Sequence, residues 1–184
     1  HLPNFFIIGA PKCGTTSLSS WLDQHPEVYM SVPKEPHYFN SDMSNRQYKT
    51  EKAYARLFSH IPNRVTAVGE ASTWYLRSDA AVPAIMKRIP EARLIIMARD
   101  PAAMAVSLFL HNKRHGHEDQ PTFESAWKLQ ERRAKGKNIP RMCRDYRFIM
   151  YGEACSIGSQ KERVLNQVPL EQVHVIWLGL MKAE

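Results

Sequence analysis

The sequence lacks any apolar run long enough to cross a membrane as a helix, which takes roughly 18 residues or more. Its longest apolar runs, FFIIGA at 5–10 and LIIMA at 94–98, have the length of strands. No signal peptide is visible either, so we expect a cytoplasmic protein with no membrane segment in this chain. The first residue is His1 rather than Met, which leaves an upstream signal or membrane anchor as the alternative.

Cysteine is scarce, with Cys13, Cys143 and Cys155 as the three examples. There is no C-x-x-C and no spacing typical of a zinc site, which argues against a metal-stapled or disulfide-rich fold. An odd, sparse count suits free thiols in a reducing compartment. A disulfide between Cys143 and Cys155 is the alternative if the protein is secreted.

Acidic residues are outnumbered, because 25 Lys and Arg stand against 18 Asp and Glu and give a net charge of +7. Such an excess favours an anionic partner. The basic residues are scattered apart from NKRHGH at 112–117 and ERRAKGK at 131–137. Neither run is interleaved with aromatic residues as in single-strand binders, so we do not expect nucleic acid as the partner.

What is present is an alternation of short apolar strands with amphipathic helices. Strands are predicted at 4–9, 28–30, 65–69, 93–98 and 173–178, and helices at 16–25, 52–61, 80–89, 100–114, 123–133 and 162–168. Asp100 and Pro101 are predicted to cap and begin the helix at 100–114. This alternation indicates an α/β fold with a mainly parallel sheet covered on both faces. We expect residues 1–184 to form one domain, shortened at its C-terminal end because the chain stops just after an apolar run.

Ligands of such sheets bind at the carboxyl ends of the strands. The segments that follow the predicted strands there are 11–16, 34–37, 70–73 and 99–107. The sequence therefore predicts that these four segments converge on one site.

The first of these segments lies in GAPKCGTTSL, residues 9–18, and resembles a phosphate-binding loop with its lysine displaced. Gly9 and Gly14 have the spacing of G-x-x-x-x-G-K-[ST], but Thr15 occupies the lysine position and Lys12 comes two residues before Gly14. The amides of Gly14, Thr15 and Thr16 at a helix N-terminus would favour an anion. A glycine turn that serves packing alone is the alternative.

Arg99 and Ser107 form a second candidate anion site. Arg99 follows a buried strand, and Ser107 lies eight residues later in the next helix. A guanidinium and a hydroxyl placed this way suit a phosphate. The alternative is an arginine that caps a neighbouring carbonyl and a serine that faces solvent.

Taken together, these motifs resemble those of sulfotransferases that use 3′-phosphoadenosine 5′-phosphosulfate (PAPS). PKCGTTSL (11–18) is similar to their 5′-phosphosulfate loop, and RLIIMARDPAAMAVS (93–107) is similar to their 3′-phosphate segment. KEPHYF (34–39) and GEASTWYL (69–76) resemble segments of the branch that contains heparan-type and many bacterial sulfotransferases. The resemblance implies a three-layer α/β/α fold related to P-loop kinases. It also implies a donor site made of Lys12, Cys13, Gly14, Thr15, Thr16, Ser17, Arg99 and Ser107. Independently of the resemblance, we expect the Cys13 side chain to pack beneath the loop, because nothing near it in the sequence marks it as a nucleophile.

The resemblance also implies the catalytic roles. Lys12 would contact the 5′-phosphate and the bridging oxygen, where charge builds as the S–O bond breaks. Glu35 would be the general base, with His37 as an orienting residue or a rival base, and an ion pair with Lys34 or Lys12 as the structural alternative for Glu35. The product would be 3′-phosphoadenosine 5′-phosphate (PAP), and no metal is expected, since no strand ends in a Walker-B-like acid.

The resemblance also bears on the acceptor of the sulfuryl group. The resemblance suggests a hydroxyl or amine, with carbohydrate as the first guess. Ala71 stands where the heparan-type pattern commonly has lysine, and Trp74 and Tyr75 would either line an acceptor cleft or pack in the core, with Ser72 as a weaker contact. The alternatives are an ATP-dependent kinase of the same fold and a nucleotide-binding module without catalysis.

Overall fold

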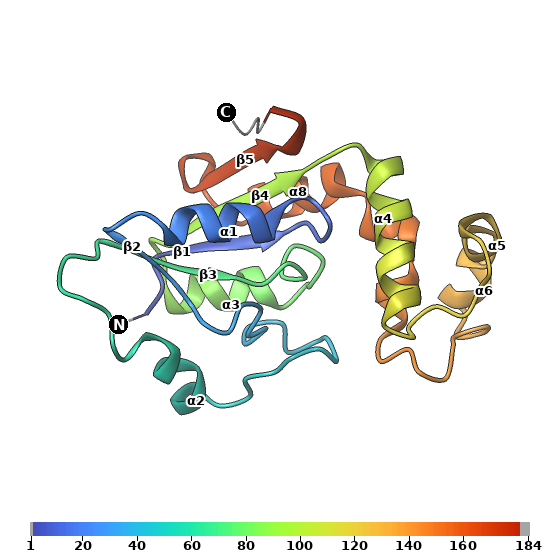
Figure 1. The fold of residues 1–184 in the computed structure, drawn as a ribbon, viewed down its shortest axis with the longest axis horizontal. Coiled ribbons are helices and arrows are strands. Elements are labelled where there is room, and N and C mark those ends of the chain that lie inside the picture. Colours follow the sequence, from blue (N-terminus) through green and yellow to red (C-terminus); the bar gives the residue numbers. More distant parts are fainter. Residues whose placement is uncertain (1, 181–184) are drawn as a thin grey trace.

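The computed structural model describes residues 2–180, which are built around one parallel sheet (Figure 1). Its strands are β1 (Phe5–Gly9), β2 (Val28–Met30), β3 (Ala67–Ala71), β4 (Arg93–Ala98) and β5 (Val173–Trp177). In Figure 1, α1 (Thr15–Asp23) covers the near face, and α3 (Ala81–Arg88) and α8 (Ile157–Leu165) lie behind the sheet. This arrangement confirms the predicted three-layer α/β/α fold.

The strand order places the ends of β1, β3 and β4 beside one another. The order is β2-β3-β1-β4-β5, and each neighbouring pair is parallel. The chain therefore leaves β1 toward one side of the sheet and later returns to the other side at β4. Such a reversal opens a crevice at the carboxyl ends of the central strands, where ligands of this fold class bind.

The burial of the strands explains their sequences. All five residues of β1 are buried, and β4 is buried from Ile96 to Ala98, as expected of central strands covered on both faces. By contrast, the edge strand β5 leaves Val175 and Trp177 nearly half exposed.

The helix α4 (Pro101–Arg114) begins as predicted. The Asp100 carboxylate accepts a hydrogen bond from the backbone N–H of Ala103 at 2.7 Å, and Pro101 occupies the first helical position. This cap directs α4 away from the end of β4, and residues from the middle of the helix, from Ser107 to Asn112, border the crevice.

Three predicted elements differ from the structure. The helix expected at 123–133 is divided into α5 (Phe123–Lys128) and α6 (Gln130–Ala134), and the one expected at 52–61 is α2 (Glu51–Ala55) followed by a 3-10 turn. The break between α5 and α6 lets the Gln130 amide donate to the Ile149 carbonyl at 2.9 Å and lets Arg133 turn inward. The helix α8 starts five residues earlier than predicted, because Ile157 and Val164 both anchor it in the core. A further short helix, α7 (Tyr151–Ala154), precedes it.

The strand β3 also lies two residues later than predicted. It covers 67–71 instead of 65–69, so Glu70 is a fully buried strand residue and not the first residue after the strand. The expectation that Glu70 belongs to the ligand-facing segment is therefore wrong.

The three cysteines are free, and no disulfide joins Cys143 to Cys155. Burial raises the pKa of the Cys13 thiol to about 11 and that of Cys155 to about 12, which keeps both thiols protonated and unreactive. Among residues 2–180, no helix combines the length and apolar character that a bilayer crossing requires.

The wing formed by α4 to α7 is held together by a buried ion pair. Arg133 and Glu118 are fully buried at their side chains, and the guanidinium donates two hydrogen bonds to the carboxylate, at 2.7 and 2.8 Å. The hydroxyl of Tyr151 donates a third, at 2.8 Å. Glu118 is thus neutralised and saturated, as a buried charge must be.

We predict that Arg133→Ala lowers the free energy of unfolding by about 3–5 kcal/mol, because Glu118 is left as an uncompensated buried charge. Arg88→Ala is the matched control, since Arg88 pairs with Glu51 on the surface, where both side chains are more than half exposed. That loss should be about 0–1 kcal/mol. Urea unfolding measures both, and equal losses would contradict the structural role of the pair.

Candidate active site

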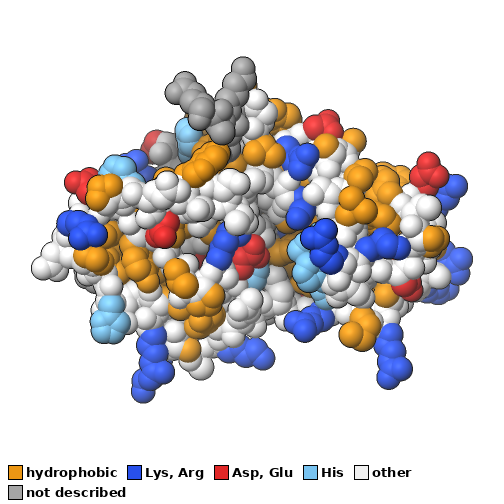
Figure 2. All heavy atoms as spheres, in the orientation of Figure 1, with side chains coloured by type: hydrophobic (Ala, Val, Ile, Leu, Met, Phe, Trp, Pro, Cys, Tyr) orange, Lys and Arg blue, Asp and Glu red, His pale blue; other side chains and the backbone are white. Residues whose placement is uncertain are grey.

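A cavity of about 650 Å³ lies at the carboxyl ends of the central strands. It is lined by residues from all four predicted segments: Pro11, Lys12, Gly14, Thr15 and Thr16; Glu35 and His37; Thr73; and Arg99 and Ser107. Ser17 and Trp74, each one residue beyond a predicted segment, line it too. Lys, Arg and His side chains gather near the middle of the face drawn in Figure 2. The strand-end rule therefore located the convergence of these segments correctly.

The loop between β1 and α1 has the geometry of an anion site. Gly14 is the N-cap of α1 with φ 83, and no side chain caps the helix. The positive φ favours glycine at this position, and a Cβ on Gly14 would lie 2.6 Å from Cδ1 of Leu178, whose side chain would have to shift. The first amides of α1, together with the Lys12 ammonium, supply positive charge to the cavity.

Cys13 is the exception in this loop. It is fully buried, and its Sγ lies 3.6 Å from Sδ of Met104 beneath the loop. Its side chain therefore packs where the sequence predicted and does not line the cavity.

Arg99 ties the end of β4 to this loop. Its Nη1 donates to the backbone carbonyl of Lys12 at 3.0 Å, while Arg99 also lines the cavity together with Ser107. Capping a carbonyl was the structural alternative for Arg99, and the structure shows it combined with exposure to the cavity. One guanidinium has five N–H donors, so this bond leaves others for a ligand.

Glu35 and His37 lie on the segment between β2 and α2. The Glu35 carboxylate accepts hydrogen bonds from the Lys34 ammonium at 2.8 Å and from the Thr73 hydroxyl at 3.2 Å, and lies 3.0 Å from Nε2 of His37. The ion pair with Lys34, expected as an alternative role, is therefore present. His37 is nearly fully buried, and its Nδ1 has no hydrogen-bond partner in the described structure.

Backbone strain is concentrated in this site. In the described part of the chain four non-glycine residues have positive φ, and three of them are Lys12 (63), Glu35 (62) and His37 (49). Residues with a Cβ avoid this region at a cost of about 1–3 kcal/mol each. Their concentration here, in the residues singled out for catalysis, supports a functional constraint on both segments.

The end of β3 holds the strained segment in place. The carbonyl of Ala71 accepts from the N–H of Glu35 at 2.9 Å, and the Ser72 hydroxyl accepts from the N–H of His37 at 3.0 Å. Ser72 and Tyr75 are fully buried, so neither lines an acceptor cleft, and for Tyr75 the core-packing alternative is correct. Trp74 does line the cavity, with its ring 4.8 Å from that of Phe148.

The charges in the cavity set the ionisation of Glu35. Burial alone would raise the pKa of this carboxyl, but the hydrogen bond with His37 and the charge and hydrogen bond of Lys34 outweigh it and lower the pKa to about 2. Glu35 is thus ionised at neutral pH.

Several residues lining the cavity were not predicted, namely Asn45, Gln47, His111, Asn112 and His117. His111 lies four residues after Ser107 on α4, so helical periodicity from Ser107 would have identified it. Burial and the nearby Lys12 lower the pKa of His111 to about 4, which leaves a neutral imidazole at neutral pH. Asn45, Gln47 and His117 lie in irregular segments, where no periodicity marks them.

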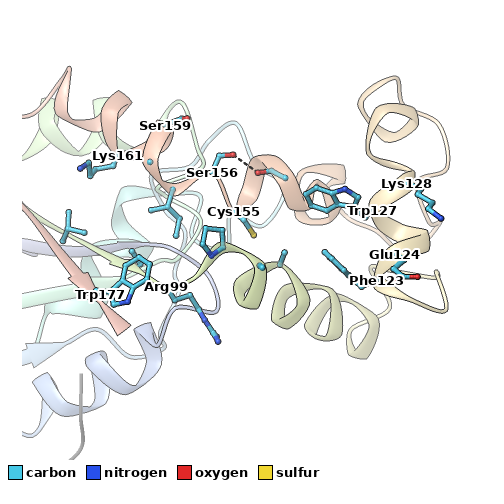
Figure 3. A pocket seen from close by; sticks show the side chains of 18 residues that line it. Arg99, Phe123, Glu124, Trp127, Lys128, Cys155, Ser156, Ser159, Lys161 and Trp177 are labelled. Atoms are coloured by element: carbon cyan, nitrogen blue, oxygen red, sulfur yellow. Dashed lines mark hydrogen bonds between the residues drawn. The ribbon is translucent and has the colours of Figure 1, made fainter. Parts of the chain in front are cut away.

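A second cavity, of about 1150 Å³, approaches Arg99 from the other side of α4 (Figure 3). Its lining is mostly apolar and includes Phe123, Trp127, Ile157 and Trp177. In Figure 3, Arg99 extends from the end of β4 toward α1 and away from the aromatic residues of α5. The charged, polar site and the apolar cavity are therefore separate environments that meet at this one residue.

Comparison with known proteins identifies the family. The model of the sulfotransferase domain matches residues 2–155. The chain belongs to the sulfotransferase family. A sulfotransferase structure from Alicyclobacillus acidocaldarius has a TM-score of 0.84 at 32% identity, over 97% of this chain and 74% of that one.

Two curated relatives share parts of the sequence. The membrane-associated sulfotransferase kil1 of Dictyostelium discoideum is 32% identical over 108 residues, which are 59% of this chain and 22% of that protein. The mouse bifunctional heparan sulfate N-deacetylase/N-sulfotransferase 4 is 31% identical over 122 residues, which are 62% of this chain and 14% of that protein. The chain thus spans less than a quarter of the length of either relative.

The lowered pKa of Glu35 predicts a pH-dependent stability. A carboxyl whose pKa falls from 4.5 to about 2 on folding contributes stability that is present above about pH 4.5 and is lost as the pH falls toward 2. The melting temperature of the wild type should therefore exceed that of Glu35→Gln at pH 6, and the difference should shrink by pH 3.

Glu51→Gln is the control for this comparison, because Glu51 pairs with Arg88 on the surface and should give a small difference at either pH. Thermal melts at both pH values measure the effect. A Glu35→Gln difference that does not change with pH would contradict the assigned interactions.

Proposed function

We propose that this protein transfers a sulfuryl group from PAPS to a hydroxyl or amine acceptor. The observation that carries the proposal is the convergence of the Lys12 loop, the Arg99–Ser107 pair and Glu35 on one cavity. The first two provide two separate anion sites, which suit a donor with a 5′-phosphosulfate and a 3′-phosphate. Membership of the sulfotransferase family supports the transferred group.

The roles of the residues follow from their positions. The amides at the start of α1 and the side chains of Thr15, Thr16 and Ser17 would bind the 5′-phosphate, and Arg99 and Ser107 the 3′-phosphate. The acceptor oxygen or nitrogen attacks sulfur and gives its proton to Glu35, while the bond from sulfur to the bridging oxygen breaks. Lys12 stabilises the charge that develops on that oxygen, and PAP leaves. No step requires a metal.

His37 is the second candidate for the base. Its Nδ1 is buried without a partner while Nε2 contacts the Glu35 carboxylate, which is the arrangement of a base oriented by a carboxylate. Glu35 remains our first assignment, because it is the more exposed of the two, with 32% of its side chain accessible against 4% for His37.

Carbohydrate is the acceptor class that we propose. Trp74 offers an aromatic surface in the cavity beside the amides of Asn45 and Gln47, a combination suited to a ring with several hydroxyls. The name of the mouse relative, which includes heparan sulfate, supports this class. A cytoplasmic location remains a prediction, and the Dictyostelium relative is named as membrane-associated.

The donor assignment predicts that PAP raises the melting temperature more than ADP does. The 3′-phosphate should gain a charge-assisted contact with Arg99 worth about 1.5–3 kcal/mol. Arg99→Ala should abolish most of this preference for PAP. The loss of the hydrogen bond from Arg99 to the Lys12 carbonyl should also weaken the binding of both nucleotides. Arg93→Ala, at the opposite end of β4, should retain it. Equal stabilisation of the wild type by ADP and PAP would refute the assignment of PAPS as the donor.

The catalytic assignment predicts that Glu35→Gln keeps PAP binding but slows turnover by about 10²–10⁴-fold. His37→Ala should slow turnover less than Glu35→Gln does, because the role assigned to His37 is to orient Glu35. PAP release from PAPS is measured with a panel of desulfated oligosaccharides, amino sugars and phenols, with and without EDTA. Abolished turnover in His37→Ala with a nearly active Glu35→Gln would make His37 the base.

The same assay separates the alternative functions. A kinase would bind ATP in preference to PAP and lose its activity in EDTA until Mg²⁺ is restored. A nucleotide-binding module would bind PAP and turn over none of the acceptors.

A further inference from the structure

The side chain of Glu70 lies in the core beneath the active site and touches neither cavity. It is fully buried, and its carboxylate has three hydroxyl neighbours. The hydroxyl of Ser72 lies 2.5 Å from Oε1, and those of Tyr54 and Tyr75 lie 2.7 and 3.1 Å from Oε2. A buried carboxylate with three hydroxyl donors is a saturated acceptor.

Two of these hydroxyls also accept hydrogen bonds from the segment that carries Glu35 and His37. The Ser72 hydroxyl accepts from the N–H of His37 at 3.0 Å, and the Tyr75 hydroxyl accepts from the N–H of Phe39 at 3.2 Å. The hydroxyl of Tyr54 contacts Glu70 but binds no amide of this segment. Glu70 is therefore connected to the 34–39 segment through two hydroxyls, those of Ser72 and Tyr75. Tyr54 takes part in neither connection.

The direction of these bonds matters because a hydroxyl has only one proton. A carboxylate at Glu70 takes the protons of Ser72 and Tyr75, so their lone pairs must face the amides of His37 and Phe39. Without that acceptor, either hydroxyl can turn its proton toward the amide, and the bond is lost. The segment needs such bonds, because Glu35 and His37 both have the strained positive φ.

We infer that Glu70 is a positioning residue for the active site: it fixes the polarity of the Ser72 and Tyr75 hydroxyls and thereby holds Glu35 and His37 in their strained conformation. The catalytic part of this inference rests on the function proposed above for Glu35 and His37. Glu70 itself contacts no reacting atom.

Glu70→Gln tests the inference, because it keeps the shape of the side chain but replaces one oxygen with an N–H donor. The amide must then donate to a hydroxyl that previously donated to it. Because the remaining oxygen still accepts, the new N–H reverses only the hydroxyl that it faces, Ser72 or Tyr75. We therefore expect the backbone amide of His37 or that of Phe39 to exchange with deuterium roughly tenfold faster than in the wild type, as follows from the loss of one hydrogen bond. Measurements are made at pH 8, since burial raises the pKa of Glu70 to about 7.

Tyr54→Phe is the matched control. It also removes one of the hydroxyls that donate to Glu70 in the core. The hydrogen bonds from the amides of His37 and Phe39 stay in place, so exchange at these two amides should not change. The amides of Phe6 and Ile7 in β1 report general destabilisation in each variant. Acceleration that is equal in β1 and in the segment, or equal in Tyr54→Phe and Glu70→Gln, would overturn the positioning role.

Two further variants keep the test decisive if Glu70→Gln does not fold. Ser72→Ala should accelerate exchange at His37 alone, and Tyr75→Phe should accelerate it at Phe39 alone. Unchanged exchange at both amides would refute the inference.

The pKa of Glu35, followed by carboxyl chemical shifts, gives a readout that a purely structural role would not move. Lys34, His37 and His111 face this carboxyl, and the first two lower its pKa. Removing the charge of Glu70 would by itself lower the pKa of Glu35 further. A rise in Glu70→Gln therefore reports the lost contact with His37 and supports the inference, whereas a fall contradicts it.

Turnover connects the inference to catalysis. With the acceptor found in the panel, Glu70→Gln should lower kcat at least tenfold while the affinity for PAP stays within about twofold. The reason is that the Glu70 carboxylate hydrogen-bonds to Tyr54, Ser72 and Tyr75 and to no residue of the donor loop. A wild type that does not bind PAP would refute the proposed function, while the exchange data would still decide whether Glu70 positions the segment.

Discussion

The attachment of the 34–39 segment to the end of β3 is the constraint on which the rest of the site depends. Glu35 and His37 have backbone conformations that an isolated peptide would rarely adopt, so their side chains meet only because other groups hold the backbone. Those groups are the Ala71 carbonyl and the Ser72 and Tyr75 hydroxyls. All three groups belong to buried residues at or just after the end of β3, the strand that is paired on one side with β1 and on the other with β2.

In the half of the cavity proposed to bind the donor, a strained residue is likewise held by a hydrogen bond from the end of a central strand. Lys12 also has positive φ, and its carbonyl accepts a hydrogen bond from Arg99 at the end of β4. The residue proposed to bind one phosphate thus also fixes the loop proposed to bind the other. Because the two halves are tied to β3 and β4, the central strands on either side of β1, the sheet sets the distance between Lys12 and Glu35.

The sequence allowed the donor half to be predicted more fully than the acceptor half, for a physical reason. The Gly14 turn and the Arg99–Ser107 spacing are local features that follow strongly apolar strands, so their convergence could be deduced from the strand-end rule. The β3 boundary was less visible, because Glu70 is a charged residue in a strand interior and polar residues normally signal a strand end. That two-residue error placed Glu70 and Ser72 on the wrong side of the boundary between core and site, whereas core packing was already one of the two alternatives for Tyr75. His111 could have been found from the helical period, whereas Asn45 and His117 depend on the path of irregular segments.

If the cavity binds donor and acceptor as proposed, this asymmetry has a consequence for how acceptor specificity can change within the fold. The donor contacts lie on elements whose positions the core determines, so substitutions there disturb the strained loop as well as the ligand. The acceptor side combines Trp74, fixed by its packing on Phe148, with Asn45, Gln47 and His117 on segments between the regular elements. None of the last three forms a hydrogen bond with Glu35 or Lys12 in the described residues, so substitutions there would alter the hydrogen bonds offered to an acceptor and leave those contacts in place. In the proposed function, the chemistry of transfer and the choice of acceptor therefore rest on different parts of the chain, which would let the second vary while the first is retained.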